Sequence, residues 1–136
     1  MKQTDLHNQI SVGTGIALTA VADGEDVVGS IIDMQGCNAL EFIFNVGAYT
    51  DGSVTPLIEE GDASDLSGAT AVADTDLLGT EAAAVLSAAG VSKVGYIGNK
   101  RYVRATAVTA ASSTLSVGCI AVKYGLRIAN EITVEQ

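Results

Sequence analysis

The chain has 136 residues, a net charge of −9 and 48% hydrophobic residues, mostly Ala, Val, Leu and Ile, with no Trp. This length fits a single domain with one core, and the hydrophobic share excludes a disordered chain. The negative charge argues against nucleic acid and anionic membrane surfaces as partners, and no apolar run approaches the roughly 18–20 residues of a membrane-spanning helix. No apolar segment follows Lys2, so we expect no signal peptide.

The first half of the chain predicts four strands. Residues 15–21 (GIALTAV) and 27–34 (VVGSIIDM) are two of them, separated by ADGED. Residues 40–46 (LEFIFNV) alternate with period two, which indicates a half-buried strand. Because the turn signal YTDGS separates this strand from residues 54–60, we predict a hairpin between the two. Pro56 has no N–H to donate, which places the second strand at an edge or a bulge.

The second half begins with residues 61–80, whose Gly, Asp, Ser and Thr predict a long irregular surface loop with one helical turn. Residues 82–89 (AAAVLSAA) are ambiguous, because Ala favours helix, but the segment is short and we predict a strand. Residues 101–109 alternate between two faces. One face carries Tyr102, Arg104, Thr106 and Val108, and the other carries Arg101, Val103, Ala105 and Ala107. After the turn TAASS, residues 115–122 are predicted to be their partner strand.

Together these segments predict an all-β fold, an antiparallel β-sandwich or jelly roll of about seven or eight strands. No repeat, linker or domain boundary is visible, so residues 1–136 are predicted to form one domain. We expect the N-terminal segment, about residues 1–10, and the tail, about residues 129–136, to be mobile.

Charge is segregated along the chain. Residues 1–92 hold fourteen acids and one base, whereas residues 93–127 hold six bases and no acid. Two interpretations stay open. In the first, Arg101 and Arg104 pair across strands with Glu41, Glu59 or Glu60, at roughly 0.2–1 kcal/mol per pair. In the second, a basic face docks on another copy or on a larger assembly.

The basic segment VGYIGNKRYVR also carries two tyrosines. Gly95 and Gly98 are expected to allow a tight turn or a left-handed backbone. Tyrosine and arginine are enriched at interfaces, so this segment is a candidate contact patch. The candidate intersubunit or cross-strand contacts are Tyr96, Lys100, Arg101, Tyr102 and Arg104.

No catalytic, cofactor-binding or metal-binding set is predicted. The single histidine, His7, lies in a polar N-terminal segment, and a hydrolytic triad or a zinc site needs more than that. Cys37 and Cys119 are predicted to be buried free thiols. Residues 74–79 (DTDLLG) begin like an EF-hand loop, but Leu78 and Val85 break the ligand set. Solvated acidic loops are therefore expected, with weak calcium binding by residues 23–26 or 59–65 left open.

Three segments occur in an order that resembles a known family. They are DMQGCNALEFIFNVGAYTDG (33–52), IEEGDASDLSG (58–68) and KVGYIGNKRYVRATAV (93–108). The chain resembles the jelly-roll capsid cement, or decoration, proteins of tailed bacteriophages such as the Bordetella podovirus, over roughly residues 30–125. The resemblance implies that the protein is not an enzyme, forms a homodimer and binds the major capsid protein on the capsid exterior. It also implies that the virion assembles in the bacterial cytoplasm.

Two other functions remain as alternatives. One is a different virion part, such as a tail or head–tail junction protein with the same sandwich. The other, from a different class, is a carbohydrate- or calcium-binding module. A fold shared among such proteins does not choose between them, because function depends on the site that the fold carries.

Overall fold

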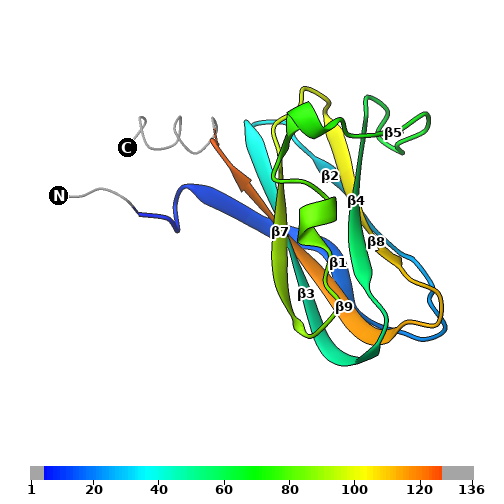
Figure 1. Ribbon diagram of the computed structural model, residues 1–136. Coiled ribbons are helices and arrows are strands. Elements are labelled where there is room, and N and C mark those ends of the chain that lie inside the picture. Colours follow the sequence, from blue (N-terminus) through cyan, green and yellow to red (C-terminus); the bar gives the residue numbers. More distant parts are fainter. Residues whose placement is uncertain (1–4, 127–136) are drawn as a thin grey trace.

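The computed structural model describes residues 5–126, which form two antiparallel β-sheets packed face to face (Figure 1). The strands are β1 (Ile10–Val21), β2 (Val27–Asp33), β3 (Ala39–Asp51), β4 (Val54–Gly61), β5 (Thr70–Ala71), β6 (Leu77–Leu78), β7 (Gly90–Tyr96), β8 (Tyr102–Thr109) and β9 (Thr114–Tyr124). Two short 3-10 helices, η1 (Asp74–Asp76) and η2 (Ala82–Ala84), flank β6. The predicted β-sandwich is confirmed.

The chain crosses repeatedly from one sheet to the other. The five-stranded sheet has the order β1-β9-β3-β7-β6, and the four-stranded sheet has the order β2-β8-β4-β5. The strands β1, β2, β3 and β4 therefore alternate between the sheets, and so do β7, β8 and β9. Two facing sheets connected in this way form the jelly-roll arrangement.

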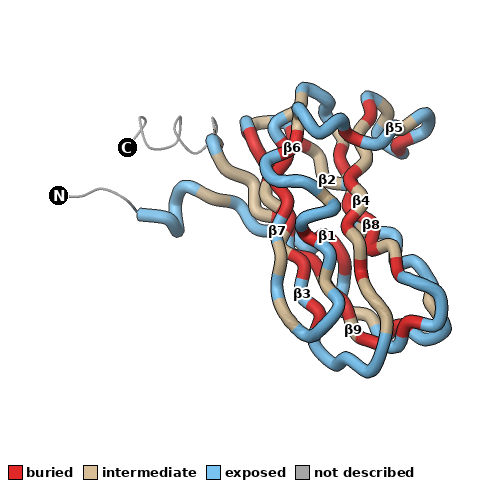
Figure 2. Tube along the Cα trace, viewed as in Figure 1, coloured by how far each residue is buried: buried red, intermediate tan, exposed pale blue. Residues whose placement is uncertain are grey.

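Alternation along each strand places one set of side chains between the sheets, where the core lies (Figure 2). In β3 the buried set includes Phe42 and Phe44, and in β8 it includes Val103, Ala105 and Ala107, which the alternation grouped on one face. Large aromatic side chains on one sheet and small ones on the other suit close packing between sheets about 10 Å apart.

Both predicted hairpins are wrong. β3 lies in the five-stranded sheet and β4 in the four-stranded sheet, so residues 40–46 and 54–60 are not hydrogen-bonded to each other. Likewise β8 pairs with β2 and β4, whereas β9 pairs with β1 and β3. A turn signal shows that the chain reverses, but in a sandwich the reversal leads to the opposite sheet as readily as to the neighbouring strand.

The region around residues 82–96 was also predicted wrongly. Residues 82–89 are not a strand: η2 covers the first three, and of the rest Leu86 forms one isolated bridge with Val54. The strand is β7, and Gly95 lies within it rather than in a turn. The predicted loop at residues 61–80 is mainly irregular, but it contains β5, η1 and β6.

Pro56 lies where the sequence placed it, at a partly open edge. It pairs with Ala107 of β8, whereas β5 reaches only Glu59 and Glu60 on the other side of β4. The missing N–H of Pro56 therefore interrupts no ladder between two partner strands.

Both cysteines are buried, as predicted. Burial raises the pKa of the Cys119 thiol to about 12. Of the segments predicted to be mobile, residues 1–4 and 129–136 lie outside the described residues, while residues 5–9 form a turn that ends at β1. Within residues 5–126, no helix has the length and apolar character to cross a membrane.

Candidate docking surfaces

Two basic residues before β8 are held in exposed ion pairs. Lys100 Nζ lies 2.7 Å from Asp62 Oδ2, and the hydrogen bond raises the pKa of Lys100. Arg101 donates through Nε and Nη2 to the two carboxylate oxygens of Asp33, at 2.9 and 3.0 Å. This bidentate contact lowers the pKa of Asp33 below its ordinary value. Asp33, on β2, is not among the acids predicted for Arg101.

Arg104 makes one of the predicted cross-strand pairs. It stands opposite Glu59 in the register of β8 and β4, and its Nη2 lies 2.9 Å from Glu59 Oε1. The two side chains are only 24% and 23% exposed. The internal interpretation of the charge segregation therefore holds for Lys100, Arg101 and Arg104, although the first two stay accessible to a partner.

Tyr96 belongs to the core rather than to a surface. It is fully buried, and its hydroxyl donates to Glu60 Oε2 at 2.5 Å and accepts from the Lys100 N–H at 3.0 Å. Burial, and then the bond to Glu60, raise the pKa of this hydroxyl well above its usual value. Gly98 is required here for space, because a Cβ would lie 2.6 Å from Tyr96 Oη. Its backbone is not left-handed.

Tyr96→Phe is expected to lower the free energy of unfolding by about 1–3 kcal/mol, because it leaves Glu60 and the Lys100 N–H without their shared partner. Thermal and urea unfolding measure this change. Tyr102→Phe is the matched control, because Tyr102 is half-buried and its hydroxyl makes no hydrogen bond within the described residues. Equal stabilities for the two variants would contradict the assignment.

Tyr102 is stacked rather than hydrogen-bonded. The guanidinium carbon of Arg101 lies 5.1 Å from the centre of its ring, within the range of a cation–π contact. Tyr102 and Arg104 both point to the outer side of the four-stranded sheet. Of the five candidate contacts, Lys100, Arg101 and Tyr102 therefore form one accessible group, while Tyr96 is internal.

The most apolar surface lies elsewhere, on the outer side of the five-stranded sheet. Leu18, Val91 and Ile120 are 74%, 65% and 50% exposed there, and Ile43 is half-buried between them. These four residues, from four adjacent strands, are called the apolar face below. They line an open depression of about 620 Å³ whose other lining residues are also uncharged: Thr14, Ile16, Ala17, Asn45, Gly118 and Cys119.

One base and one acid lie beside Ile43 of the apolar face. Lys93 stands opposite Ile43 in the β3–β7 register, and Glu41 lies two residues before Ile43. Burial raises the pKa of Glu41, and the positive charge of Lys93 lowers it in part. In a chain of net charge −9, the depression itself is thus lined by uncharged residues, and the acid and the base beside Ile43 offset each other.

The alternation of β3 and β9 contained the signal for this surface, and sequence reasoning did not use it. Ile43 and Ile120 occupy the outward positions of strands whose inward positions are also apolar. Outward apolar residues on several strands combine into one surface only when the strand order is known.

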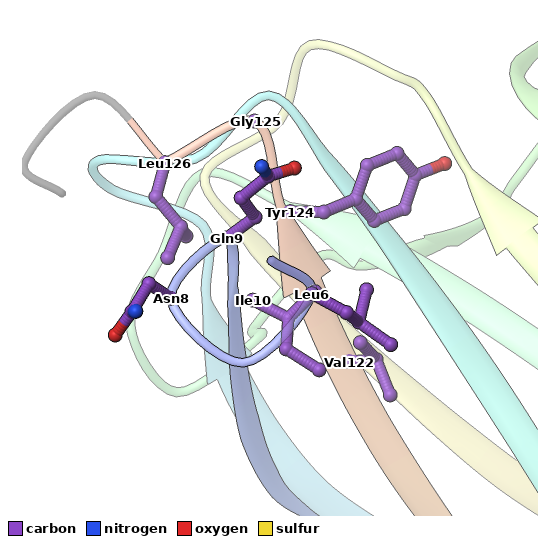
Figure 3. A pocket seen from close by; sticks show the side chains of 8 residues that line it. All are labelled: Leu6, Asn8, Gln9, Ile10, Val122, Tyr124, Gly125 and Leu126. Atoms are coloured by element: carbon purple, nitrogen blue, oxygen red, sulfur yellow. The ribbon is translucent and has the colours of Figure 1, made fainter. Parts of the chain in front are cut away.

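A second hollow, of about 460 Å³, lies where the first described residues meet the end of β9 (Figure 3). Leu6, Ile10 and Val122 gather on one side of it, and Asn8 and Leu126 lie on the other. The described residues contain no group of three or more His, Cys, Asp or Glu side chains that would hold a metal ion. His7 is exposed near this hollow.

Comparison with known proteins identifies a shared fold and assigns the chain to no family. No protein-family model and no curated protein matches the chain. Among solved structures, the chain is similar to the SPBc2 prophage-derived protein YomS, with a TM-score of 0.52 and 13% identity over 84% of this chain and 91% of that one. It is also similar to a Bacillus endospore appendage protein from disulfide-linked pili, with a TM-score of 0.47 and 14% identity over 87% and 89% of the chains. The fold is thus shared with a prophage-derived protein.

Proposed function

We propose that this protein is a non-enzymatic structural protein of a tailed-phage virion, and that it caps and bridges major capsid subunits on the outer surface of the head. The apolar face carries the proposal, because a broad, nearly neutral apolar surface suits adhesion to another protein. The resemblance of residues 30–125 to capsid cement proteins and the fold shared with a prophage-derived protein support it. Assembly would take place in the cytoplasm of the host bacterium.

The energy available from one contact is modest. Fully burying an aliphatic side chain contributes about 1.5–3 kcal/mol, and the apolar face offers four side chains that are already partly covered. Burial of these four side chains on docking therefore contributes roughly 5 kcal/mol of favourable free energy, which is comparable with the free-energy cost of association. A shell repeats the contact many times, and a cement protein that touches two subunits at once binds through multivalency.

The accessible group of Lys100, Arg101 and Tyr102 has a secondary role in this proposal. Lys100 and Arg101 are about half exposed while paired, so they reach a partner only at the rim of a contact. Rim charges chiefly change association rates and their salt dependence. The affinity is therefore assigned to the apolar face.

Binding to undecorated capsids of the parent phage tests the proposal. We expect saturable binding at a fixed number of copies per capsid, and about hundredfold weaker binding for Ile120→Asp, which places a charge in the contact. Val28→Asp is the matched control, because Val28 is 60% exposed on β2 of the other sheet. Absence of saturable binding would reject the head-capping function. Immunogold labelling confined to tails would instead support the alternative function, that of a tail or head–tail junction protein.

A further inference from the structure

The four sheet edges of this sandwich are protected unequally. An exposed edge strand presents unpaired N–H and C=O groups to other chains, and proteins usually cover such edges or place charges, prolines or bulges on them. From the strand orders, the edges are formed by β1 and by β7 with β6 in one sheet, and by β2 and by β4 with β5 in the other. Residues 62–89 run along two of these edges (Figure 1).

The edge of β4 is covered on both sides of Pro56. Beside β5, the Ile58 N–H donates to Glu81 Oε1 at 2.5 Å, and the Ile58 carbonyl accepts from the Val72 N–H at 2.9 Å. Farther along, Val54 and Leu86 exchange two main-chain hydrogen bonds of 2.8 and 2.9 Å. Only Pro56 lies open between these contacts among the described residues of β4, and it has no N–H to donate to a strand from another molecule.

The edges of β7 and β2 are protected by other means. β6 pairs with Tyr96 and Gly95, and Ser92 Oγ donates to the Ala84 carbonyl at 2.7 Å, which holds η2 beside β7. β2 is short, has an irregular register between Val28 and Ile31, and ends at the charged Asp33.

β1 is different. Its twelve residues, ISVGTGIALTAV, contain no charged residue and no proline. The register of β1 with β9 is irregular between Thr14 and Thr19, in the middle of the strand. Gly29 of β2 lies close to this part, and a Cβ added to Gly29 would lie 2.4 Å from the Gly15 carbonyl oxygen. The regular part, Ile10–Thr14, pairs with β9 on one side, and on its other side its main chain receives no hydrogen bond from any described residue. This part is called the free edge.

We propose that the free edge is the self-association site of this protein, where β1 pairs antiparallel with β1 of a second copy about a two-fold axis. A strand that pairs with itself in this way makes the same contacts on both sides, as a closed two-fold dimer requires. The two five-stranded sheets would join edge to edge into one continuous sheet. The two apolar faces would then lie side by side on one surface.

Charge favours a second copy at this place. Two chains of net charge −9 repel each other, so they associate most readily where local charge is lowest. The free edge has no charge of its own, and the gap beside it, between β1 and β2, is lined by one acid and one base, Asp33 and Lys123. Val12 is 60% exposed at its centre, and Gly13 has no atom within 4 Å of where its Cβ would be. Nothing on this strand obstructs a close approach.

Spin labels at two positions test the geometry in solution. Antiparallel pairing centred on Val12 places the two copies of that residue one strand spacing, about 5 Å, apart. Val91 lies on β7, three strands from β1, so its two copies are seven spacings, roughly 34 Å, apart across the strands. Val12 is level with Gly95 of β7, four residues from Val91, which adds roughly 27 Å along the strands and gives about 43 Å in all. Both native thiols are buried, so Val12→Cys and Val91→Cys direct the label to the introduced sites, and wild type treated alike is the control.

We expect strong dipolar broadening at residue 12 and a distance near 43 Å at residue 91. Two similar distances would mean that the apolar faces stack on each other, and this would overturn the proposal. A protein that stays monomeric throughout a concentration series in sedimentation equilibrium would overturn it as well. These measurements use the isolated protein, so their outcome is independent of capsid binding.

Two lysines on the free edge provide a second test. With Val12 at the axis, Val12→Lys places two like charges directly opposite each other, and Thr14→Lys adds a like charge at the diagonal position, which opposes strand pairing. The net charge changes from −9 by two units to −7, so general repulsion between copies decreases, and any loss of pairing must come from the edge itself. We expect a monomer with an unchanged melting temperature, whereas Val91→Lys still pairs. A double variant that still pairs would exclude the free edge as the contact.

Discussion

Gly29→Ala is expected to destabilise the protein by about 3 kcal/mol, which lowers its melting temperature by roughly 10 °C. A Cβ at this position would lie 2.3 Å from the Ala105 carbonyl oxygen and 2.4 Å from the Gly15 carbonyl oxygen. Both atoms belong to the main chain, so no side-chain rotation relieves the clash. β2 must move away either from β8, its partner in the four-stranded sheet, or from β1 in the facing sheet.

Gly13→Ala is the matched control for this prediction. Gly13 also lies in a strand, but an added Cβ there has no atom within 4 Å, and neither glycine has a left-handed backbone. The conformational cost of replacing glycine is therefore similar at the two sites, and the difference between the variants reports the clash. Equal melting temperatures in calorimetry would show that the edges of the two sheets are not in contact at Gly29.

Arg104→Ala is expected to destabilise the isolated protein by about 2 kcal/mol, between the values for exposed and for buried ion pairs. The substitution leaves Glu59, only 23% exposed, without its cation. Urea unfolding measures the loss. Lys100→Ala is the comparison, because Asp62 is 73% exposed and solvent screens its pair, so the loss of stability is expected to be smaller.

A double-mutant cycle separates the Arg104–Glu59 pair from the two side chains themselves. Arg104→Leu combined with Glu59→Leu removes both charges, and we expect it to be more stable than Arg104→Leu alone, because no partly buried charge remains unpaired. If Arg104→Ala melts like wild type but binds capsids poorly, the arginine serves docking instead. The ion pair within the chain would then contribute nothing to folding.

Part of the candidate site followed from the sequence. Glu59 was among the acids predicted for Arg104, because both residues lie on strands that their alternation identifies. Arg101 was paired with the wrong acids, because its true partner, Asp33, comes beside it only when β2 adjoins β8. The apolar face was missed for the same reason: its four side chains come from β1, β9, β3 and β7, which no sequence pattern ordered.

By itself, the sequence determined that most of the chain forms short strands and which residues of an alternating strand share a face. The alternation of side chains between the two faces of a strand is a local property. Residues such as Phe42, Val103 and Val117 therefore point inward in whichever sheet they lie. Only the tertiary structure decided which strands are neighbours. Hydrogen bonds between strands join main-chain groups that are the same for every residue, so alternation cannot distinguish a hairpin partner from a strand in the opposite sheet. The order of strands depends on how two whole sheets pack, and with it come the paired arginines, the apolar face and the free edge of β1.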